Sequence, residues 1–265
     1  MMLNFAKNIG KAALYQYYDI AKLFKRPYAF IHILAHPRSG SSLLVHLLAS
    51  HPNICGFGES KLQYASENDL EKLPNKVLLT LRRFPRLGRE KYMLDKLVHD
   101  FLLSTENSDI LCSEDCRVIF LIREPHSTIR SIMRVLDYDL SRAVDYYLTR
   151  LDSLENYARV VSKAQDSIFI RYKELLYNTD EVFDLLQQFL ELKEPLSEEY
   201  AILRTTGKFG YGDSSKNIFL GHIERKGHNE KTQLKQGKIG DEVDVAFKRC
   251  CIELDKLCMS IRSLS

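Results

Sequence analysis

Three short groups of residues in this chain could bind anions or move a proton. The loop 36–42 reads His-Pro-Arg-Ser-Gly-Ser-Ser, Arg123 precedes Glu124-Pro125 with Ser131 eight positions beyond it, and Glu59 follows Gly58. Guanidinium groups, hydroxyls and backbone amides bind phosphate or sulfate oxygens, and a carboxylate can accept a proton as a general base. Together these groups predict an anion-binding site with acid–base chemistry beside it.

The loop 36–42 has a buried strand before it and a helix after it in the predicted structure. Residues 29–34 form an almost continuous apolar run, which is typical of a strand covered on both faces, and residues 43–49 have a helical pattern. Backbone N–H groups at the start of such a helix point outward, and the helix dipole adds positive potential. This arrangement favours an anion site; a turn with an incidental Arg38 and a serine N-cap is the alternative.

The spacing of this loop is that of a phosphate-binding P-loop with two departures. Ala35 stands at the position of the first glycine, and Ser41 stands at the position of the lysine that normally pairs with the β- and γ-phosphates. The fixed cation here is Arg38, which lies earlier in the loop. The missing lysine argues against an ATPase or an ordinary nucleotide kinase.

Arg123 comes directly after a second apolar run, residues 118–122, so we expect it at the carboxyl end of a strand. A hydroxyl two turns into the next helix, Ser131, can converge with it on one phosphate. For the base, Glu59 follows a short apolar segment, 54–57, and apolar neighbours can raise a carboxyl pKa toward the useful range. The rival bases are His36, His46 and His51.

The run His-Pro-Arg-Ser-Gly-Ser-Ser-Leu-Leu resembles the 5′-phosphosulfate-binding motif of sulfotransferases that use 3′-phosphoadenosine 5′-phosphosulfate (PAPS), and it is most similar to the tyrosylprotein and bacterial type. Arg-Glu-Pro…Ser resembles the family's 3′-phosphate motif. The resemblance is dense at residues 35–61 and 118–131. It implies that Glu59 and Arg38 are catalytic, and that the cofactor is held by these residues: Arg38, Ser39, Gly40, Ser41, Ser42, Arg123 and Ser131.

Weaker similarities extend along the chain. Tyr172 in Arg-Tyr-Lys-Glu-Leu is implied to lie near the adenine, and short matches implicate Ser215, Lys216, Arg225, Lys226 and Gly227 in cofactor binding. Cytosolic members stack the adenine on a tryptophan, but this chain has no Trp. Tyr64, Phe209 or Tyr211 would have to take that place, or the contact is absent.

The predicted elements define one α/β domain, a P-loop-like three-layer domain with a central parallel sheet flanked by helices. Strand-like runs at 118–122 and 167–170 are each followed by helical pattern, and helices are expected over 141–162 and 180–190. Residues 1–265 would form this single domain, with an amphipathic helix over 1–26, a Gly-rich loop over 205–240 that covers the cofactor, and a C-terminal helix over 241–265. The first helix could lie on a membrane surface, although packing on its own domain or a partner is the favoured interpretation.

Composition narrows the class of protein. The chain has 265 residues and a formal net charge of only +3, which argues against a general nucleic-acid binder. The six cysteines lack zinc-site spacing, no secretory signal is evident, and no run is apolar enough to span a membrane, so we expect a cytoplasmic protein with free thiols. A basic run, Arg82 to Lys91, is interpreted as a solvated face rather than a contact for an acidic acceptor.

These observations predict a PAPS-dependent sulfotransferase that moves a sulfuryl group to a hydroxyl by in-line displacement, leaving 3′-phosphoadenosine 5′-phosphate. No metal is required if Arg38 and the loop amides carry the charge of the leaving group. The acceptor is expected to be a small-molecule or carbohydrate hydroxyl rather than a peptide tyrosine, and a homo-oligomer stays open. The alternatives are a P-loop kinase-like phosphotransferase and a non-catalytic nucleotide-binding protein.

Overall fold

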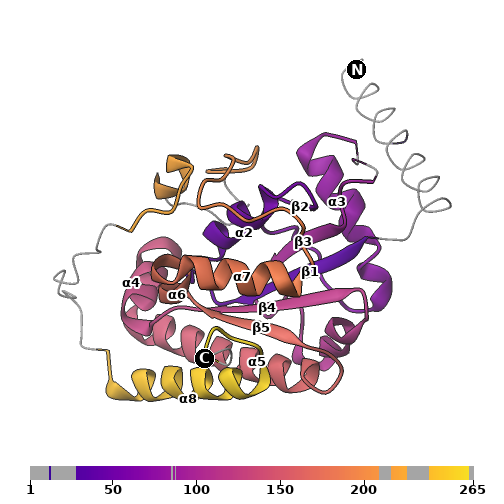
Figure 1. Cartoon of the computed structure of the whole chain (residues 1–265). Helices are drawn as coiled ribbons and strands as arrows, with labels where there is room; N and C mark the ends of the chain where they lie inside the picture. The colour runs from indigo at the N-terminus through magenta and orange to yellow at the C-terminus, as the bar shows by residue number, and fades with distance from the viewer. Residues whose placement is uncertain are drawn as a thin grey trace, which may run out of the picture.

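A computed structural model describes residues 28–208, 216–225 and 239–262, except 85 and 87, together with residue 12. At its centre is a five-stranded parallel sheet with the strand order β2-β3-β1-β4-β5 (Figure 1). The strands are β1 (Ala29–Ala35), β2 (Ile54–Gly56), β3 (Tyr92–Leu97), β4 (Cys116–Ile122) and β5 (Ser167–Arg171). The expected α/β fold with a parallel central sheet and flanking helices is confirmed.

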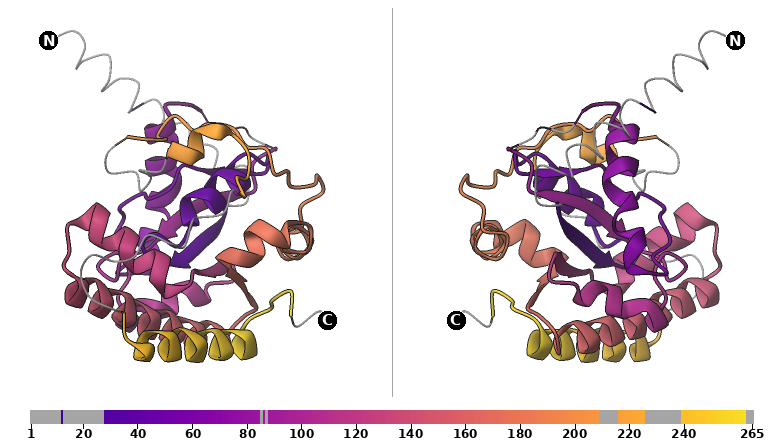
Figure 2. Two further views of the ribbon diagram at one scale, coloured as in Figure 1. Left: turned by 90° about the vertical axis from the view of Figure 1, so that its left-hand side faces the viewer. Right: turned by 90° about the vertical axis from the view of Figure 1, so that its right-hand side faces the viewer.

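Alternate residues of β1 enter two separate cores, one on each face of the sheet. Phe30 and Leu34 pack with α3 (Lys72–Leu81), α4 (Pro125–Leu136), α5 (Leu140–Val161) and α8 (Asp241–Leu257). Ile31 and Ile33 pack with α2 (Ser41–Ala49), α6 (Tyr172–Tyr177) and α7 (Thr179–Phe189). Burial on both faces explains the continuous apolar run of this strand. Figure 2 shows α5 and α8 side by side on one side of the sheet.

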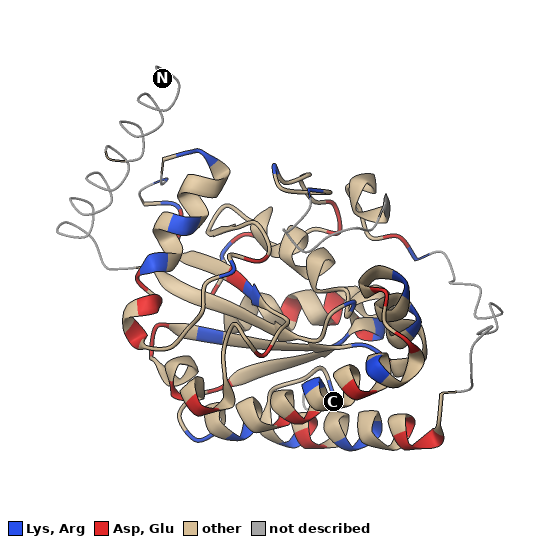
Figure 3. Ribbon diagram, turned by 180° about the vertical axis from the view of Figure 1, so that it is seen from behind, with Lys and Arg blue, Asp and Glu red and all other residues tan. Residues whose placement is uncertain are grey.

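Short 3₁₀ helices complete the described chain: η1 (Glu67–Asp69), η2 (Thr105–Cys112) and η3 (Lys216–Leu220). Both acidic and basic residues occur along the outer helices, α8 in particular (Figure 3). This mixed pattern agrees with the small net charge of the chain. No helix among the described residues is long and apolar enough to cross a membrane.

The expected helices over 43–49, 141–162 and 180–190 are confirmed within two residues as α2, α5 and α7. The C-terminal helix expected over 241–265 is wrong in its extent, since α8 ends at Leu257. Cys258 is extended, and the backbone of Met259 is hydrogen bonded to Ser167 and Phe169 at the edge of β5. Pairing with the open sheet edge therefore replaces the last helical turn.

Among the strands and α-helices of the described chain, β3 and α3 were not anticipated from the sequence. Their insertion places β3 beside β1, so the carboxyl ends of β3, β1 and β4 lie next to each other, where parallel α/β sheets bind ligands. Except for residue 12, the helix expected over 1–26 lies outside the described residues. Much of segment 205–240 does also, so its covering role stays a prediction.

Candidate functional site

The loop after β1 turns sharply into α2 at the carboxyl end of the central strand. Gly40 occupies the N-cap position of α2 with φ +91°, and Arg38 is also left-handed at φ +66°. Ser39 Oγ accepts the N–H of Ser41 at 3.3 Å, and the N–H of Ser39 donates to the carbonyl of His36. The helix start and its dipole therefore face the end of the sheet, as an anion site requires.

The two anion motifs predicted from the sequence meet in space. Arg38 Nε donates to Ser131 Oγ at 2.9 Å, although the residues are 93 positions apart. Arg38 comes from the loop after β1, and Ser131 lies in α4, the helix that follows β4. A guanidinium, a serine hydroxyl and a helix N-terminus are thus gathered at one point.

His36 joins the two loops through its imidazole. Its Nε2 accepts the backbone N–H of Arg123 at 2.9 Å, and its Nδ1 lies 2.9 Å from the carbonyl of Pro37. An amide can only donate and a carbonyl can only accept, so the neutral Nδ1–H tautomer fits both contacts. Burial lowers the pKa of His36 to about 4. Both nitrogens are engaged, so His36 is a structural connector and not an available base.

Arg123, Tyr172 and Gly40 form a stack beside this connector. The guanidinium of Arg123 lies over the Tyr172 ring, 4.6 Å from its centroid. The other neighbour of the ring is Gly40, where an added Cβ would overlap the ring atoms. Gly40 therefore satisfies two demands at once, a left-handed backbone and a close approach. Tyr172 thus lies against Gly40 of the anion loop; its contact with adenine, which the resemblance implies, stays a prediction.

Glu59 is placed beside a buried lysine that the sequence interpretation missed. Lys96 Nζ lies 3.2 Å from Glu59 Oε1 and donates to Ser42 Oγ at 3.1 Å. The side chains of Lys96 and Glu59 are only 2% and 10% exposed. A lysine from the end of β3 thus contacts the loop in which the usual lysine is absent.

Asp95 fixes the turn that carries Glu59. Its carboxylate accepts the N–H of Ser60 at 2.8 Å and the hydroxyls of Ser60 and Tyr64. Burial raises the pKa of Asp95, and the hydrogen bonds from Ser60 and Tyr64 oppose this shift. Since Asp95 and Lys96 are consecutive on a strand, they point to opposite faces and hold the Glu59–Ser60 turn from two sides.

Arg150, on α5, is a second residue that the sequence interpretation missed. Its guanidinium is buried, donates to the carbonyls of Ala35 and Leu97 at 3.0 and 2.7 Å, and forms an ion pair with Asp100. It therefore ties together the carboxyl ends of β1 and β3. The signal available in the sequence was a basic residue on the apolar face of the predicted helix, between Tyr147 and Leu154.

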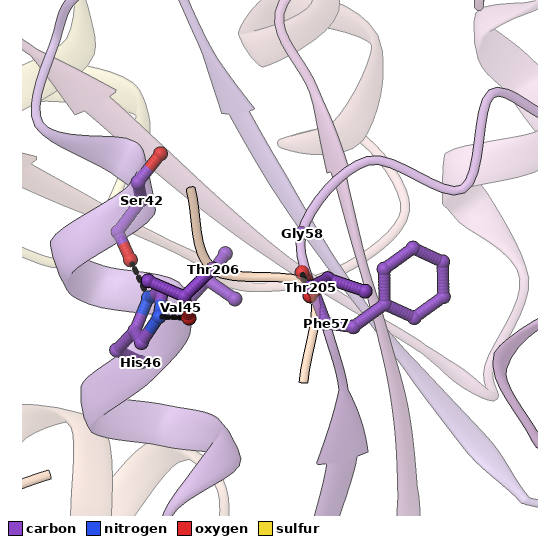
Figure 4. Close-up of a pocket in the computed structure, with 7 residues that line it drawn as sticks. All are labelled: Ser42, Val45, His46, Phe57, Gly58, Thr205 and Thr206. Carbon is purple, nitrogen blue, oxygen red and sulfur yellow. Dashed lines mark hydrogen bonds between the residues drawn. The ribbon is translucent and has the colours of Figure 1, made fainter. Parts of the chain in front are cut away.

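The remaining histidine rivals have structural contacts. His46 Nδ1 lies 2.7 Å from the carbonyl of Ser42, and its Nε2 lies 2.7 Å from Thr206 Oγ1 (Figure 4). His51 Nε2 lies 3.0 Å from the carbonyl of Glu194. The two His46 contacts border a small, partly open pocket lined by Ser42, Val45, His46, Phe57, Gly58, Thr205 and Thr206. The contact between His46 and Thr206 attaches the start of segment 205–240 to α2.

Of the weaker matches late in the chain, Arg225 has its contacts away from the two motifs. Arg225 donates to the Leu176 carbonyl at 2.6 Å and to Thr179 Oγ1 at 3.0 Å, and it pairs with Glu198. Tyr64 is buried and its hydroxyl donates to Asp95, so the suggestion that Tyr64 contacts adenine is wrong. Lys216 begins η3. The other predicted positions, Ser215, Lys226, Gly227, Phe209 and Tyr211, lie outside the described residues.

The basic run lies before the first residue of β3, at the end of the sheet where the parallel strands begin. Arg83 pairs there with Glu90, and the backbone of Lys91 bonds to Asn53. The basic run is thus remote from Glu59, which lies at the carboxyl ends of the strands. Within the described ranges, no group of three His, Cys, Asp or Glu side chains could hold a metal ion.

Comparison with known proteins supports the fold. The sulfotransferase domain of the Synechococcus PCC 7002 olefin synthase matches 85% of this chain and 95% of its own, with a TM-score of 0.57 and 19% sequence identity. A likeness at this identity shows a shared fold. No protein-family model matches the chain, and no curated protein does.

Proposed function

We propose that this protein is a sulfotransferase that moves a sulfuryl group from PAPS to a hydroxyl acceptor. The observation that carries the proposal is the contact between Arg38 and Ser131, which unites two motifs that resemble those for the 5′-phosphosulfate and the 3′-phosphate. The fold shared with a sulfotransferase domain supports it. PAPS, when bound, supplies the activated sulfuryl group.

The residues present fit an anionic nucleotide with phosphates at two positions. Arg38 and Arg123 provide fixed positive charge, and Ser131 and the start of α2 provide hydrogen-bond donors. Gly40 leaves room for the Tyr172 ring beside them. In this assignment Ser39 to Ser42 hold the 5′-side and Arg123 with Ser131 holds the 3′-phosphate. Ser215, Lys216, Lys226 and Gly227 would contribute from the later segment, whereas Arg225 is held by Glu198, Thr179 and the Leu176 carbonyl.

Glu59 is the base in this mechanism. Its carboxylate accepts the proton of the acceptor hydroxyl as the oxygen attacks, and Lys96, whose Nζ lies 3.2 Å from Glu59 Oε1, holds the carboxylate in position. Lys96 also holds Ser42, so the base and the anion loop share one buried cation. Arg38 stabilises the charge that develops on the transferred group and the leaving group.

The nucleotide preference can be tested without knowing the acceptor. We expect 3′-phosphoadenosine 5′-phosphate to raise the melting temperature, because ligands that bind only the folded state stabilise it. ATP with Mg²⁺ should give a smaller shift. A shift with ATP·Mg²⁺ alone would favour the kinase-like alternative and contradict the proposal.

Catalysis is tested by Glu59→Gln. We expect kcat for release of 3′-phosphoadenosine 5′-phosphate to fall about 10²–10⁴-fold over a panel of hydroxyl acceptors, while the thermal shift persists. Glu90→Gln is the matched control, because Glu90 is also buried and paired with an arginine but lies before the start of β3, away from the proposed site. Nucleotide binding without any turnover would indicate the non-catalytic alternative.

A further inference from the structure

The segment that follows β3 carries ring side chains beside the proposed base. The His99 and Phe101 rings are stacked, with centroids 5.0 Å apart and planes 17° from parallel. Phe101 is 67% exposed, so much of its ring is open to a ligand. Exposed apolar side chains gathered next to a reactive group mark binding surfaces more often than isolated ones do.

These rings continue onto α5 and the turn before it. His99 Nδ1 and the Tyr146 hydroxyl are hydrogen bonded at 2.5 Å, and Tyr138 meets Tyr146 edge-on with centroids 5.9 Å apart. The guanidinium of Arg142 covers the Tyr138 ring, 3.9 Å from its centroid. Phe101, His99, Tyr146 and Tyr138 thus form a continuous row, which we call the aromatic strip.

The aromatic strip lies close to Glu59. His99 is three residues beyond Lys96, and the charge of Glu59 acts on both His99 and Tyr146. Burial lowers the pKa of His99, and the charge of Glu59 opposes this shift. Burial raises the pKa of Tyr146 to about 12. Both rings are therefore uncharged near neutral pH, so contact of an apolar ring with His99 or Tyr146 removes no charge of these two side chains from water.

We propose that the aromatic strip binds the acceptor and that the acceptor carries its hydroxyl on an aromatic ring. This inference rests on the function proposed above. A flat ring stacked on Phe101 gains the offset or edge-on contacts that aromatic pairs favour. Its hydroxyl would lie toward Glu59.

The acidity of the hydroxyl supports the same class of acceptor. In the proposed mechanism the Glu59 carboxylate accepts the proton of the attacking hydroxyl. A phenolic hydroxyl, with a pKa of about 10, releases its proton to such a base more readily than an alcohol does. In the step, the aryl oxygen forms a bond to sulfur, and the bond from sulfur to the 5′-phosphate oxygen breaks. The electron pair of the broken bond leaves with the bisphosphate, and the proton passes to Glu59.

The experiment compares three acceptors on the full chain with PAPS: 2-naphthol, N-acetyltyrosinamide and methyl glucoside. We expect turnover of the first two and little of the third; preference for 2-naphthol indicates a small phenol, and preference for N-acetyltyrosinamide indicates a tyrosine side chain. Binding of 2-naphthol is also measured by its fluorescence without PAPS, which gives a readout independent of activity.

Phe101→Ala should raise KM and the dissociation constant for 2-naphthol roughly tenfold, as expected for loss of an aromatic contact. Phe84→Ala is the control, because Phe84 is also an exposed phenylalanine, 58% exposed, but follows α3 at the other edge of the sheet. Both variants should keep the wild-type melting temperature and affinity for 3′-phosphoadenosine 5′-phosphate.

Equal effects of the two substitutions, or a preference for methyl glucoside, would overturn the aromatic acceptor. Failure of all three acceptors with bisphosphate binding intact would also overturn it, while the nucleotide assignment would stand. Absence of bisphosphate binding in the wild type would instead refute the proposed function itself.

Discussion

Lys96 Nζ lies 3.2 Å from Glu59 Oε1 and 3.1 Å from Ser42 Oγ, so one buried ammonium joins the proposed base to the anion loop. This lysine comes from β3, more than fifty positions after the loop in the sequence. A buried cation with two fixed partners positions both groups without the mobility of a surface lysine. The base and the cofactor loop are therefore coupled through a single side chain.

This coupling predicts a stability effect that a double-mutant cycle can measure. Lys96→Met should lower the free energy of unfolding by about 3–5 kcal/mol, because it leaves the Glu59 carboxylate buried without its partner. Adding Glu59→Gln should restore part of that loss, giving a coupling energy of about 1–3 kcal/mol in urea denaturation at pH 7.

The exposed pair Lys256–Glu253 provides the control cycle. Exposed pairs contribute little, so the cycle of Lys256→Met and Glu253→Gln should give less than about 0.5 kcal/mol. If the two cycles give equal coupling energies, the special role of the buried pair is wrong.

The strand that supplies Lys96 shows where sequence reasoning fails. The elements β1, α2 and β4 follow from apolar runs and helical periodicity, because their side chains serve mainly to fill the two cores. In β3, Asp95 and Lys96 interrupt the apolar run, although both are buried. Because two buried positions of β3 hold polar residues of the candidate site, this strand lacks the continuous apolar run by which a buried strand is recognised.

The candidate site was predictable in its local motifs only. Arg38 and Arg123 follow predicted strand ends, and Ser131 lies two turns into the helix after the second of these strands, so their chemistry could be read from their neighbours. Lys96, Asp95 and Arg150 act through partners that are distant in the sequence, and only the strand order brings them together. Spacing along the chain contains no information about that order.

Arg123→Ala should weaken binding of 3′-phosphoadenosine 5′-phosphate by about 2–5 kcal/mol in isothermal titration, because the substitution removes a largely buried cation from the proposed 3′-phosphate site. The backbone bond to His36 would remain, so the loop should keep its position. Ser131→Ala should weaken binding of the same nucleotide by less, about 0.5–1.5 kcal/mol.

Arg117→Ala tests whether total charge explains such a loss. Arg117 lies near the amino end of the same strand, β4, and contacts the carbonyl of Glu114. The two alanine variants change the net charge equally. Similar losses of affinity in both would contradict a local phosphate contact at Arg123.

Gly40→Ala should destabilise the protein more than Gly88→Ala does. Both glycines have positive φ, +91° and +84°, so both substitutions incur the cost of a left-handed alanine, about 1–2 kcal/mol. An alanine Cβ at Gly40 would also overlap the Tyr172 ring, whereas nothing lies within 4 Å of one at Gly88. The excess loss in urea denaturation reports the ring contact.

The origin of that excess can be checked with a second substitution. Tyr172→Ala in the Gly40→Ala background should recover the excess, because it removes the ring that the new methyl group meets. Gly40→Ala should also weaken binding of 3′-phosphoadenosine 5′-phosphate, whereas Gly88→Ala should not. No difference between the two glycine variants would mean that the Tyr172 ring moves away without cost.

The stability of the protein should fall as the pH drops from about 6.5 toward 4. His32 and His36 are buried, and burial lowers the pKa of each to about 4 from an ordinary 6.5. Between these values the unfolded chain binds protons that the folded chain does not, so acid favours unfolding. Each histidine contributes up to about 3 kcal/mol to this loss. Asp95, whose pKa is raised by burial, acts in the opposite direction.

His32→Leu isolates one of these histidines. Neither ring nitrogen of His32 has a hydrogen-bond partner, and its ring lies between Phe30 and Tyr64, so an apolar side chain of similar size suits the position. The variant should lose less stability than the wild type between pH 6.5 and 4, measured by urea denaturation at each pH. Its stability at pH 7 should be equal or higher, because no unpartnered nitrogen remains buried at this position. An unchanged slope would mean that His32 takes up its proton in the folded protein near its ordinary pKa.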